Sequence, residues 1–344
     1  MIFALAAVVA ALLTSLGTQA MRKVALRFNI ADHPNERRIN MQPVPRAGGL
    51  SVAVVFTLVG GALILLAPQL QISPGSGAER LTDQGAAALL GGTLIAGIIG
   101  FIDDRYDLRA RWQIIGQLLI SLIPIAFGLR ILFVSNPFGT GVLLFPDAVA
   151  FGVTIFWTLG MQNSMNFIDG LDGLSGGISL LAAVTLGLIA LPTSPLLAAL
   201  CFTLAGALVG FLRHNFHPAS IYMGTSGILA VAYALAVLAI LGTAKVAAAL
   251  LILGVPIIDA FFVILGRILA GRSPYTSDKS HIHRRLLDNG FSHRSAVLVL
   301  YGITALLSIG ALLLTESATL YAFAGLLVVL GGVAVYLARR AEGL

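Results

Sequence analysis

Two adjacent carboxylates, Asp103 and Asp104, follow a strongly apolar stretch from Ala86 to Ile102. If this stretch is a helix, the pair lies at its C-terminal end, where the macrodipole disfavours a negative group by roughly 0.3–1 kcal/mol. A cation is therefore expected beside the pair. The sequence leaves two candidates open: a local arginine, Arg105 or Arg109, or a hard divalent ion such as Mg²⁺ or Mn²⁺, which prefers carboxylate oxygen.

A second polar run, NSMNFIDGLDG, has a hydrogen-bonding side chain at every third position: Asn163, Asn166, Asp169 and Asp172. Gly170 and Gly173 favour unwinding of the backbone between two apolar stretches. The pattern predicts amides on the end of a helix and carboxylates on the turn that follows. A connecting loop needs far fewer polar groups, so the run is interpreted as part of a site.

A third segment, DKSHIHRRLL, extends from Asp278 to Leu287 and places His281 and His283 beside Arg284 and Arg285. Cations and imidazoles are groups that bind a diphosphate. A zinc site is the weaker interpretation, because the loop lacks cysteine and a suitably spaced third ligand. The plain alternative is a basic loop that faces lipid headgroups.

Four further residues are candidates for the same region. Arg46 in PVPRAGG, and Arg213 and His217 in RHNFHPASIYMG, either add to a positively charged surface or serve only as anchors at the membrane boundary. Asp259 follows Pro256 inside an apolar stretch, and a carboxylate in lipid is rare enough to indicate function. The sequence leaves the role of Asp259 open.

The elements that position these residues are membrane helices. Of the 344 residues, 58% are hydrophobic and 10% are charged, whereas a soluble domain has about 25% charged residues. Crossing the hydrocarbon takes about 20 apolar residues. We identify eleven such stretches: Ile2 to Ala20, Gly48 to Ala67, Ala86 to Ile102, Ile114 to Val134, Val149 to Gly160, Leu174 to Leu191, Leu196 to Leu212, Ile228 to Leu241, Val246 to Leu265, Ala296 to Leu314 and Thr319 to Leu337.

The fold class is therefore all-α, a polytopic membrane bundle of about eleven transmembrane helices that forms one integral-membrane domain over residues 1–344. With the N-terminus outside, 18 of the 21 lysines and arginines lie on inner segments, and only Arg80, Arg130 and Lys245 lie outside. The first stretch is expected to be a retained span, because it lacks a basic segment before it. The polar segments then share the cytoplasmic face of the cell membrane.

Some classes of function are excluded or disfavoured. The net charge of +6 is accounted for by membrane topology and anionic headgroups, and nothing indicates nucleic-acid recognition. The single cysteine, Cys201, lies in the middle of a span, which excludes a disulfide within one chain. A secondary transporter is disfavoured, because polar breaks in transporters lie near the midplane and here they gather at one boundary.

The ordered motifs PNERR, PVPRAGG, FIDDRYDL, NSMNFIDGLDGLSGG, FLRHNFHPASIYMG and SHIHRRLLDNGFSHR cover nearly the whole chain. Together they resemble the polyprenyl-phosphate N-acetylhexosamine-1-phosphate transferase family, especially the branch that begins teichoic-acid, O-antigen and similar surface polymers. The resemblance implies transfer of a sugar 1-phosphate from a UDP-sugar to undecaprenyl or another polyprenyl phosphate, with release of UMP and use of Mg²⁺, or alternatively Mn²⁺.

The resemblance also implies roles for individual residues. It makes Asp103 and Asp104 the catalytic acidic pair and Asn166 a metal ligand. It places Asp169 and Asp172 in the nucleotide-sugar pocket and His281 and His283 at the diphosphate. With the residues identified above, the expected substrate-binding set is Arg46, Asn163, Asp169, Asp172, His281, His283 and Arg284.

The chain departs from the family pattern at four polar positions. The family usually has Met-Gly-Asp after the seventh span, the Asp being a metal ligand, whereas here Thr225 follows Met223 and Gly224. Gln113 stands where a lysine is common, Arg284 where a second paired histidine is usual, and Asn40 where the first basic loop has histidine. Losing a carboxylate removes a full charge from the cation site, which bears on metal affinity and rate more than on fold.

The leading hypothesis is an active phosphotransferase that uses UDP-N-acetylglucosamine or a related UDP-N-acetylhexosamine in cell-surface polysaccharide synthesis. The alternative is a weakened or inactive relative, with Thr225 in place of the metal-binding Asp, that binds lipid-linked precursor or acts as a scaffold. The expected partners are the UDP-sugar, the polyprenyl phosphate and the bilayer. The oligomeric state is not readable from the sequence, and a homodimer is left open.

Overall fold

The structure is a computed structural model that describes residues 2–32, 43–76, 81–136, 141–242, 245–269, 271, 281–314 and 316–341. Asn40, Arg80 and Asp278, which were used in the sequence analysis, lie outside the described residues. The described helices are α1 (Ile2–Arg27), α2 (Leu50–Leu66), α3 (Asp83–Tyr106), α4 (Ala110–Ala126), α5 (Asp147–Ile168), α6 (Leu174–Ala190), α7 (Pro195–Asn215), α8 (Gly224–Leu241), α9 (Lys245–Ile252), α10 (Gly254–Leu269), α11 (Ile282–Asp288), α12 (His293–Leu313) and α13 (Glu316–Ala341).

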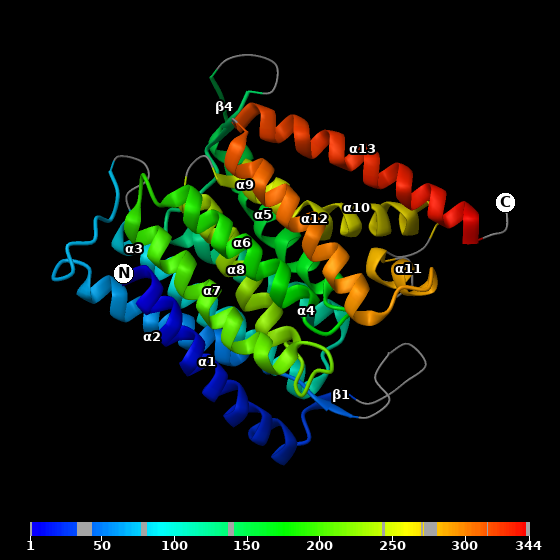
Figure 1. Cartoon of the computed structure of the whole chain (residues 1–344). Coiled ribbons are helices and arrows are strands. Elements are labelled where there is room, and N and C mark those ends of the chain that lie inside the picture. Colours follow the sequence, from blue (N-terminus) through cyan, green and yellow to red (C-terminus); the bar gives the residue numbers. More distant parts are fainter. Residues whose placement is uncertain are drawn as a thin grey trace.

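Two small antiparallel pairs complete the described elements. Strands β1 (Ala31–Asp32) and β2 (Val44–Pro45) pair near the end of α1, and β3 (Phe133–Ser135) pairs with β4 (Val142–Leu144) between α4 and α5. The two pairs lie at opposite ends of the bundle (Figure 1). Each apolar stretch expected to be helical contains helix, although α4 ends at Ala126 and the end of the stretch from Ile114 to Val134 lies in β3. The prediction of an all-α membrane bundle is confirmed.

The ninth stretch, expected from Val246 to Leu265 as one span, is broken. Helices α9 and α10 meet at an angle of 76°. Pro256 has no backbone N–H to donate to the carbonyl of Ile252, and its ring would clash with that carbonyl in a continuous helix. The helix therefore stops at Ile252 and a new one begins at Gly254.

Helix α8 lies at the centre of the bundle. Its apolar residues surround it on all sides, the pattern of a buried helix. It packs against α3 and α5, while α7 packs against α1 and α6. Tyr233 of α8 reaches the neighbouring helix and donates to the carbonyl of Ala88 at 2.8 Å, with its ring seated over Gly92. This contact fixes α8 against α3 well away from the polar residues.

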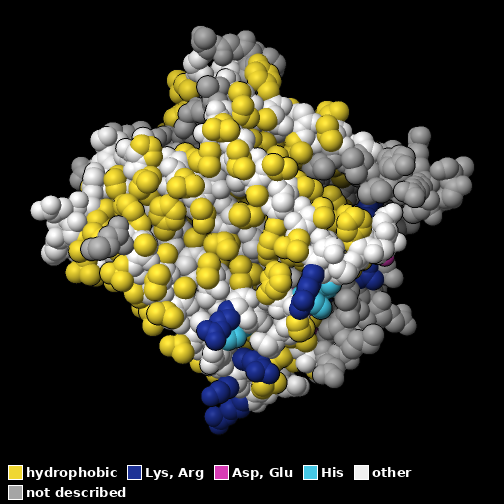
Figure 2. All heavy atoms as spheres, in the orientation of Figure 1, with side chains coloured by type: hydrophobic (Ala, Val, Ile, Leu, Met, Phe, Trp, Pro, Cys, Tyr) yellow, Lys and Arg dark blue, Asp and Glu magenta, His cyan; other side chains and the backbone are white. Residues whose placement is uncertain are grey.

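The outer helices expose apolar side chains to the bilayer. In a membrane-length window only 28% of α1 and 33% of α12 is buried in the protein, against 83% of α8. Apolar side chains cover most of the face seen in Figure 2, and basic and histidine side chains gather toward its lower part. The chain is thus a multi-pass membrane protein.

Five described helices are long and apolar enough to cross a membrane, or six with the bent pair, and several shorter apolar helices accompany them. The number of eleven spans and the outside position of the N-terminus remain predictions.

Candidate functional site

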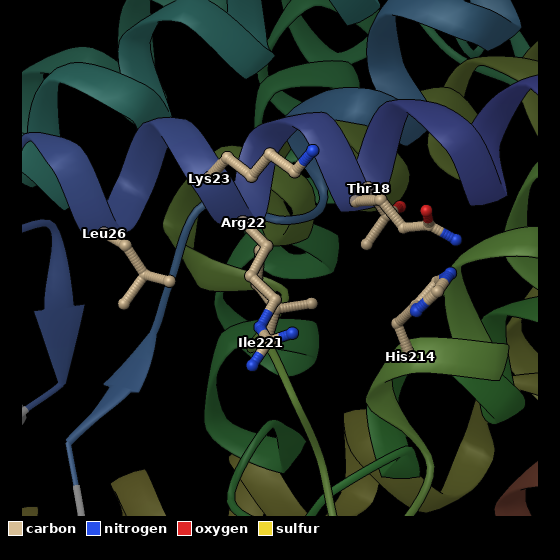
Figure 3. A pocket seen from close by; sticks show the side chains of 7 residues that line it. Thr18, Arg22, Lys23, Leu26, His214 and Ile221 are labelled. Atoms are coloured by element: carbon tan, nitrogen blue, oxygen red, sulfur yellow. The ribbon is translucent and has the colours of Figure 1, made fainter.

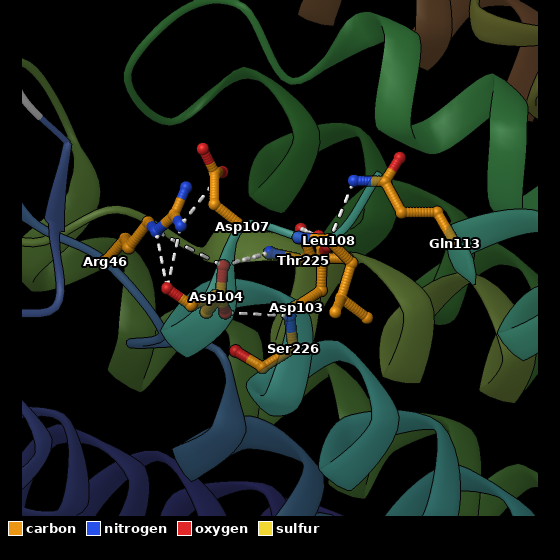
Figure 4. Close-up of polar contacts among 8 residues, drawn as sticks. All are labelled: Arg46, Asp103, Asp104, Asp107, Leu108, Gln113, Thr225 and Ser226. Carbon is orange, nitrogen blue, oxygen red and sulfur yellow. Dashed lines mark hydrogen bonds and ion pairs between the residues drawn. The ribbon is translucent and has the colours of Figure 1, made fainter. Parts of the chain in front are cut away.

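The acidic pair lies in the last turn of α3, where that helix meets the first turn of α8. The two oxygens of Asp104 accept from the backbone N–H groups of Thr225, at 2.9 Å, and Ser226, at 3.0 Å (Figure 4). The first N–H groups of a helix have no partner within it and carry partial positive charge. Asp104 therefore caps α8 from a different helix, which compensates for its own position at the unfavourable end of α3.

Glycines allow this close approach. A side chain at Gly100 would collide with the backbone of Thr225 and Ser226, so the two helices meet backbone to backbone. Gly224 has φ +70° and faces the carboxylate of Asp104, where any Cβ would overlap the oxygens. Asp104 can reach the end of α8 only because both positions lack a side chain.

Asp103 is held by neutral donors. Its Oδ1 accepts from the backbone N–H of Leu108 at 3.1 Å and from Nε2 of Gln113 at 3.0 Å. Its Oδ2 accepts from the hydroxyl of Thr225 at 2.7 Å. Gln113 and Thr225, two of the departures from the family pattern, are thus both direct partners of this carboxylate.

The cation beside the pair is Arg46, from a distant part of the chain. Its Nε and Nη2 donate to the main-chain carbonyl of Asp104 at 3.0 and 2.7 Å, and Nε lies 3.8 Å from the Asp104 carboxylate. Nη2 also lies 3.3 Å from a carboxylate oxygen of Asp107. Of the two kinds of cation that the sequence left open, the arginine beside the pair is Arg46 and not Arg105 or Arg109, and it contacts both the carboxylate and the main-chain carbonyl of Asp104.

The NSMNFIDGLDG run has the predicted form. Helix α5 ends at Ile168, Asp169 follows as its C-cap, and Gly173 has φ +81° at the start of α6. Asn163 donates to Gln117 of α4 at 2.9 Å and to the carbonyl of Leu159 at 2.8 Å, so its amide joins two helices. The side chain of Asn166 is exposed and has no hydrogen bond within the described residues, which leaves it free to contact a ligand.

Asp169 connects the acidic groups. The pKa of Asp169 is raised to about 6, chiefly because the carboxyl is buried; the hydrogen bond from the Ser175 hydroxyl lowers it, and the charges of Asp104 and Asp172 raise it. The turn after α5 therefore lies within electrostatic reach of the end of α3.

The second carboxylate of the turn, Asp172, belongs to a clasp with two histidines. Its Oδ2 accepts from Nδ1 of His217 at 2.7 Å and from the backbone N–H of Ala219 at 3.0 Å. Its own backbone N–H donates to Nε2 of His293 at 2.9 Å, and the two imidazoles stack at 4.1 Å. The clasp joins the α5–α6 turn, the α7–α8 loop and the start of α12.

Asp172, His217 and His293 also form a group whose ligand atoms lie within 4.8 Å of one another, a spacing that suits a metal ion. The hydrogen bonds of the clasp use Asp172 Oδ2 and His293 Nε2 internally. Two imidazole ligands also favour a softer metal ion than the one that the oxygen ligands of the acidic pair favour. The main role that these contacts support for the clasp is therefore to hold the three segments together, and not to bind a metal ion.

The histidine loop forms α11 and packs on the same turn. The imidazole of His283 lies directly over Gly170, and His281 and His283 stack at 5.6 Å. Burial lowers the pKa of His283 to about 4, with smaller contributions from neighbouring cationic groups, so this imidazole is neutral at pH 7. Its Nδ1 is buried and has no hydrogen-bond partner within the described residues, which makes it a candidate contact for a ligand.

Asp259, whose role was left open, holds this loop in place. Its Oδ2 accepts from Nδ1 of His281 at 2.8 Å and its Oδ1 from the backbone N–H of Ile282 at 2.8 Å. A carboxylate beside Nδ1 holds the proton on that nitrogen and orients the ring. Arg284 is half-buried on the same short helix.

The structure thus brings parts of the polar segments together at one end of the bundle. These parts are Arg46, Asp104, the turn at 169–172, Thr225 and the histidine loop. Sequence reasoning missed Ser175 as the partner of Asp169 and His293 as the partner of Asp172. Ser175 carries no signal beyond its place in a Gly-Ser-rich helix start. His293 directly follows Ser292, a helix N-cap, and that start signal marks it as an ordered residue.

The raised pKa of Asp169 predicts a pH dependence of stability. A buried carboxyl keeps its proton to higher pH in the folded than in the unfolded protein, so its contribution to stability falls as the pH rises from 3.8 to about 6 and is then constant. Asp169→Asn should therefore raise the melting temperature at pH 7.5 by several degrees and remove the loss of stability between pH 3.8 and about 6. The melting temperature of the solubilised protein, measured by thermal unfolding between pH 4 and 8, tests both expectations.

The matched control is Asp288→Asn, at an exposed carboxylate at the end of α11. It should leave the melting temperature and its pH profile unchanged. Parallel profiles for the wild type and Asp169→Asn would contradict the burial of a protonatable Asp169.

Comparisons with known proteins identify the family of this chain. The model of glycosyl transferase family 4 matches residues 86–243, which include the acidic pair, the α5–α6 turn and Thr225. A probable undecaprenyl-phosphate N-acetylglucosaminyl 1-phosphate transferase of Bacillus subtilis is 35% identical over 311 residues, 88% of this chain and 82% of that protein.

A decaprenyl-phosphate N-acetylglucosaminephosphotransferase of Mycolicibacterium smegmatis is 33% identical over 335 residues, 90% of this chain and 81% of that protein. A phospho-N-acetylmuramoyl-pentapeptide-transferase of Trichormus variabilis is 37% identical over 162 residues, 43% of this chain and 44% of that protein. Because the first two relatives match along nearly the whole chain, the protein belongs to the polyprenyl-phosphate N-acetylhexosamine-1-phosphate transferases of glycosyl transferase family 4.

Proposed function

We propose that the protein transfers N-acetylglucosamine 1-phosphate from its UDP-sugar to undecaprenyl phosphate at the cytoplasmic face of the cell membrane. An oxygen of the lipid phosphate attacks the sugar-linked phosphorus of the donor. The bond from that phosphorus to the oxygen of the α-phosphate breaks, UMP leaves with the electron pair, and the lipid carries a diphosphate-linked sugar. The two relatives that match along nearly the whole chain are both named as transferases, which favours this activity over a non-catalytic scaffold.

The observation that carries the proposal is the meeting of carboxylates, imidazoles and an apolar bundle at one boundary. Phosphoryl transfer needs positioning and neutralisation of charge more than covalent help. Asp103 and Asp104 are fixed by hydrogen bonds, so their charges need no reorganisation when substrate binds. His281, His283 and Arg284 would bind the donor diphosphate, with Asp169 and Asp172 at the nucleotide-sugar.

The location at a membrane boundary follows from the substrates. The acceptor has a long apolar tail that must remain in lipid, whereas the donor is soluble. A polar site at one end of a helical bundle lets the lipid phosphate meet a water-borne partner. We place Arg46 and Asn163 at the edges of the substrate site, beside the acidic pair and on α5.

Dependence on a metal ion is general in this family, and the residues present fit Mg²⁺, with Mn²⁺ as the second choice. The donor atoms are oxygens: Asp103 Oδ2 and the two Asp104 carboxylate oxygens each accept one hydrogen bond and keep a lone pair, and the amide of Asn166 is exposed. Mg²⁺ prefers such oxygens and retains waters. When bound, it would neutralise charge on the phosphates.

The function is tested by release of UMP. Purified protein with UDP-N-acetylglucosamine, undecaprenyl phosphate and Mg²⁺ should release UMP and form the lipid-linked sugar. Asp104→Asn should lower kcat/KM by roughly a thousandfold, because it removes charge from the reacting centre. Asp147→Asn, at an exposed carboxylate paired with Arg130 at the other end of α5, should leave the rate unchanged.

Thr225→Asp separates an active enzyme from a degraded one. It restores the carboxylate usual in the family next to Asp103, and it should lower the Mg²⁺ concentration needed for half-maximal rate by several-fold in an enzyme that is already active. UMP release only from Thr225→Asp, with none from the wild type, would contradict the proposed function.

Asp259→Asn tests the histidine loop. The amide would remove the negative charge beside Nδ1 of His281, and with it the support for a positively charged imidazole whose Nε2–H can donate to a diphosphate. If Nε2 of His281 contacts the diphosphate, kcat/KM should fall about a hundredfold with the melting temperature little changed. An unchanged kcat/KM would remove His281 from the site, and Asp288→Asn, on the opposite end of α11, serves as the control.

A further inference from the structure

Helices α1 and α7 run parallel and stay in contact, turn by turn, until α7 ends. A Cβ at Gly206 would collide with the backbone of Ala7, and a Cβ at Gly210 with that of Ala11. One turn further, Ser15 Oγ and His214 Nε2 hydrogen-bond at 3.0 Å. Helix α7 then ends at Asn215, but α1 continues to Arg27. The last turns of α1 therefore no longer have α7 beside them.

A cavity of about 330 Å³ opens where the two helices part (Figure 3). Arg22, Lys23 and Leu26 line it from α1, His214 lines it from the end of α7, and Ile221 closes it from the α7–α8 loop. Its lining thus combines three basic or imidazole groups with the neutral polar side chains of Thr18 and Gln19 and two aliphatic side chains.

Within the part of the chain that the structure describes, Arg22 and Lys23 have no acidic partner. Arg22 and Lys23 are exposed, and no carboxylate among the described residues lies within ion-pair distance of either. The charge of Arg22 also reaches His214 across the cavity. Two cations gathered in one hollow without a counter-ion favour an anion.

The surroundings indicate what carries that anion. Toward the middle of the membrane, α1 exposes a run of large apolar side chains: Leu5, Val8, Val9, Leu12, Leu13 and Leu16. A molecule with an anionic head in the cavity and hydrocarbon chains along this face would satisfy both surfaces. We propose that the cavity between the ends of α1 and α7 binds the phosphate of an anionic glycerophospholipid of the bilayer.

This site is separate from the acidic pair. Ile221 faces the cavity, whereas Gly224, Thr225 and Ser226, farther along the same loop and into α8, contact Asp104. The α7–α8 loop thus lies between the two. A bilayer phospholipid is favoured over the polyprenyl phosphate because the cavity opens beside the lipid-facing side of the peripheral helix α1, away from the reacting carboxylates.

Native mass spectrometry of the full-length protein with added phosphatidylglycerol or phosphatidylcholine tests the proposal. The wild type should retain one phosphatidylglycerol more tightly than any phosphatidylcholine. In the Arg22→Gln, Lys23→Gln double variant, the affinity for that lipid should fall roughly thirtyfold, the effect of removing two basic groups near an anionic headgroup. Arg27→Gln, an exposed arginine of α1 outside the cavity, should retain it.

Equal retention of the two lipids by the wild type, or unchanged retention of phosphatidylglycerol by the double variant, would overturn the proposal. Preferential displacement of the bound lipid by a short polyprenyl phosphate would assign the cavity to the acceptor, and displacement by inorganic phosphate alone would show a headgroup-independent anion site. Each of these results overturns the phospholipid. UMP release by the double variant, expected near the wild-type rate, shows separately that the protein is folded.

Discussion

The bond between the carboxylate of Asp104 and the first turn of α8 is the constraint on which the polar end of the molecule depends. The backbone N–H groups of Thr225 and Ser226 donate to the negatively charged carboxylate. This contact joins the C-terminal end of α3 to the N-terminal end of α8. Each helix end is unfavourable to leave unpaired in a membrane. Pairing them satisfies both and fixes the acidic pair at the boundary.

The other polar groups are arranged around this bond. Arg46 caps the carbonyl end of α3 and also faces the carboxylate, while Thr225 turns its hydroxyl to Asp103. A third carboxylate at position 225 would add negative charge beside two others, whereas the threonine hydroxyl donates a hydrogen bond. The resulting site has less negative charge to offer a cation, and its two carboxylates are held mainly by neutral donors.

Hydropathy was sufficient to predict the long apolar helices, because backbone groups in lipid must be satisfied within each segment, but it gave no sign of the short helix α11. The turn after α5 was also predictable, since Gly170 and Gly173 mark where helix cannot continue. The partner of the acidic pair was not. Arg105 and Arg109 are close in sequence, but Arg46 reaches the pair only through the packing of β2 and the following turn, which local patterns do not encode. The break before Pro256 was missed because the stretch is apolar on both sides of it.

Hydrogen–deuterium exchange at the start of α8 tests the central bond most directly. The N–H groups of Thr225 and Ser226 have no partner within their own helix, and among the described residues Asp104 is the acceptor of both. The account predicts that a peptide covering these residues is protected in the wild type and exchanges faster in Asp104→Ala, with Asp107→Ala unchanged. Equally fast exchange of this peptide in the wild type and in Asp104→Ala would contradict it.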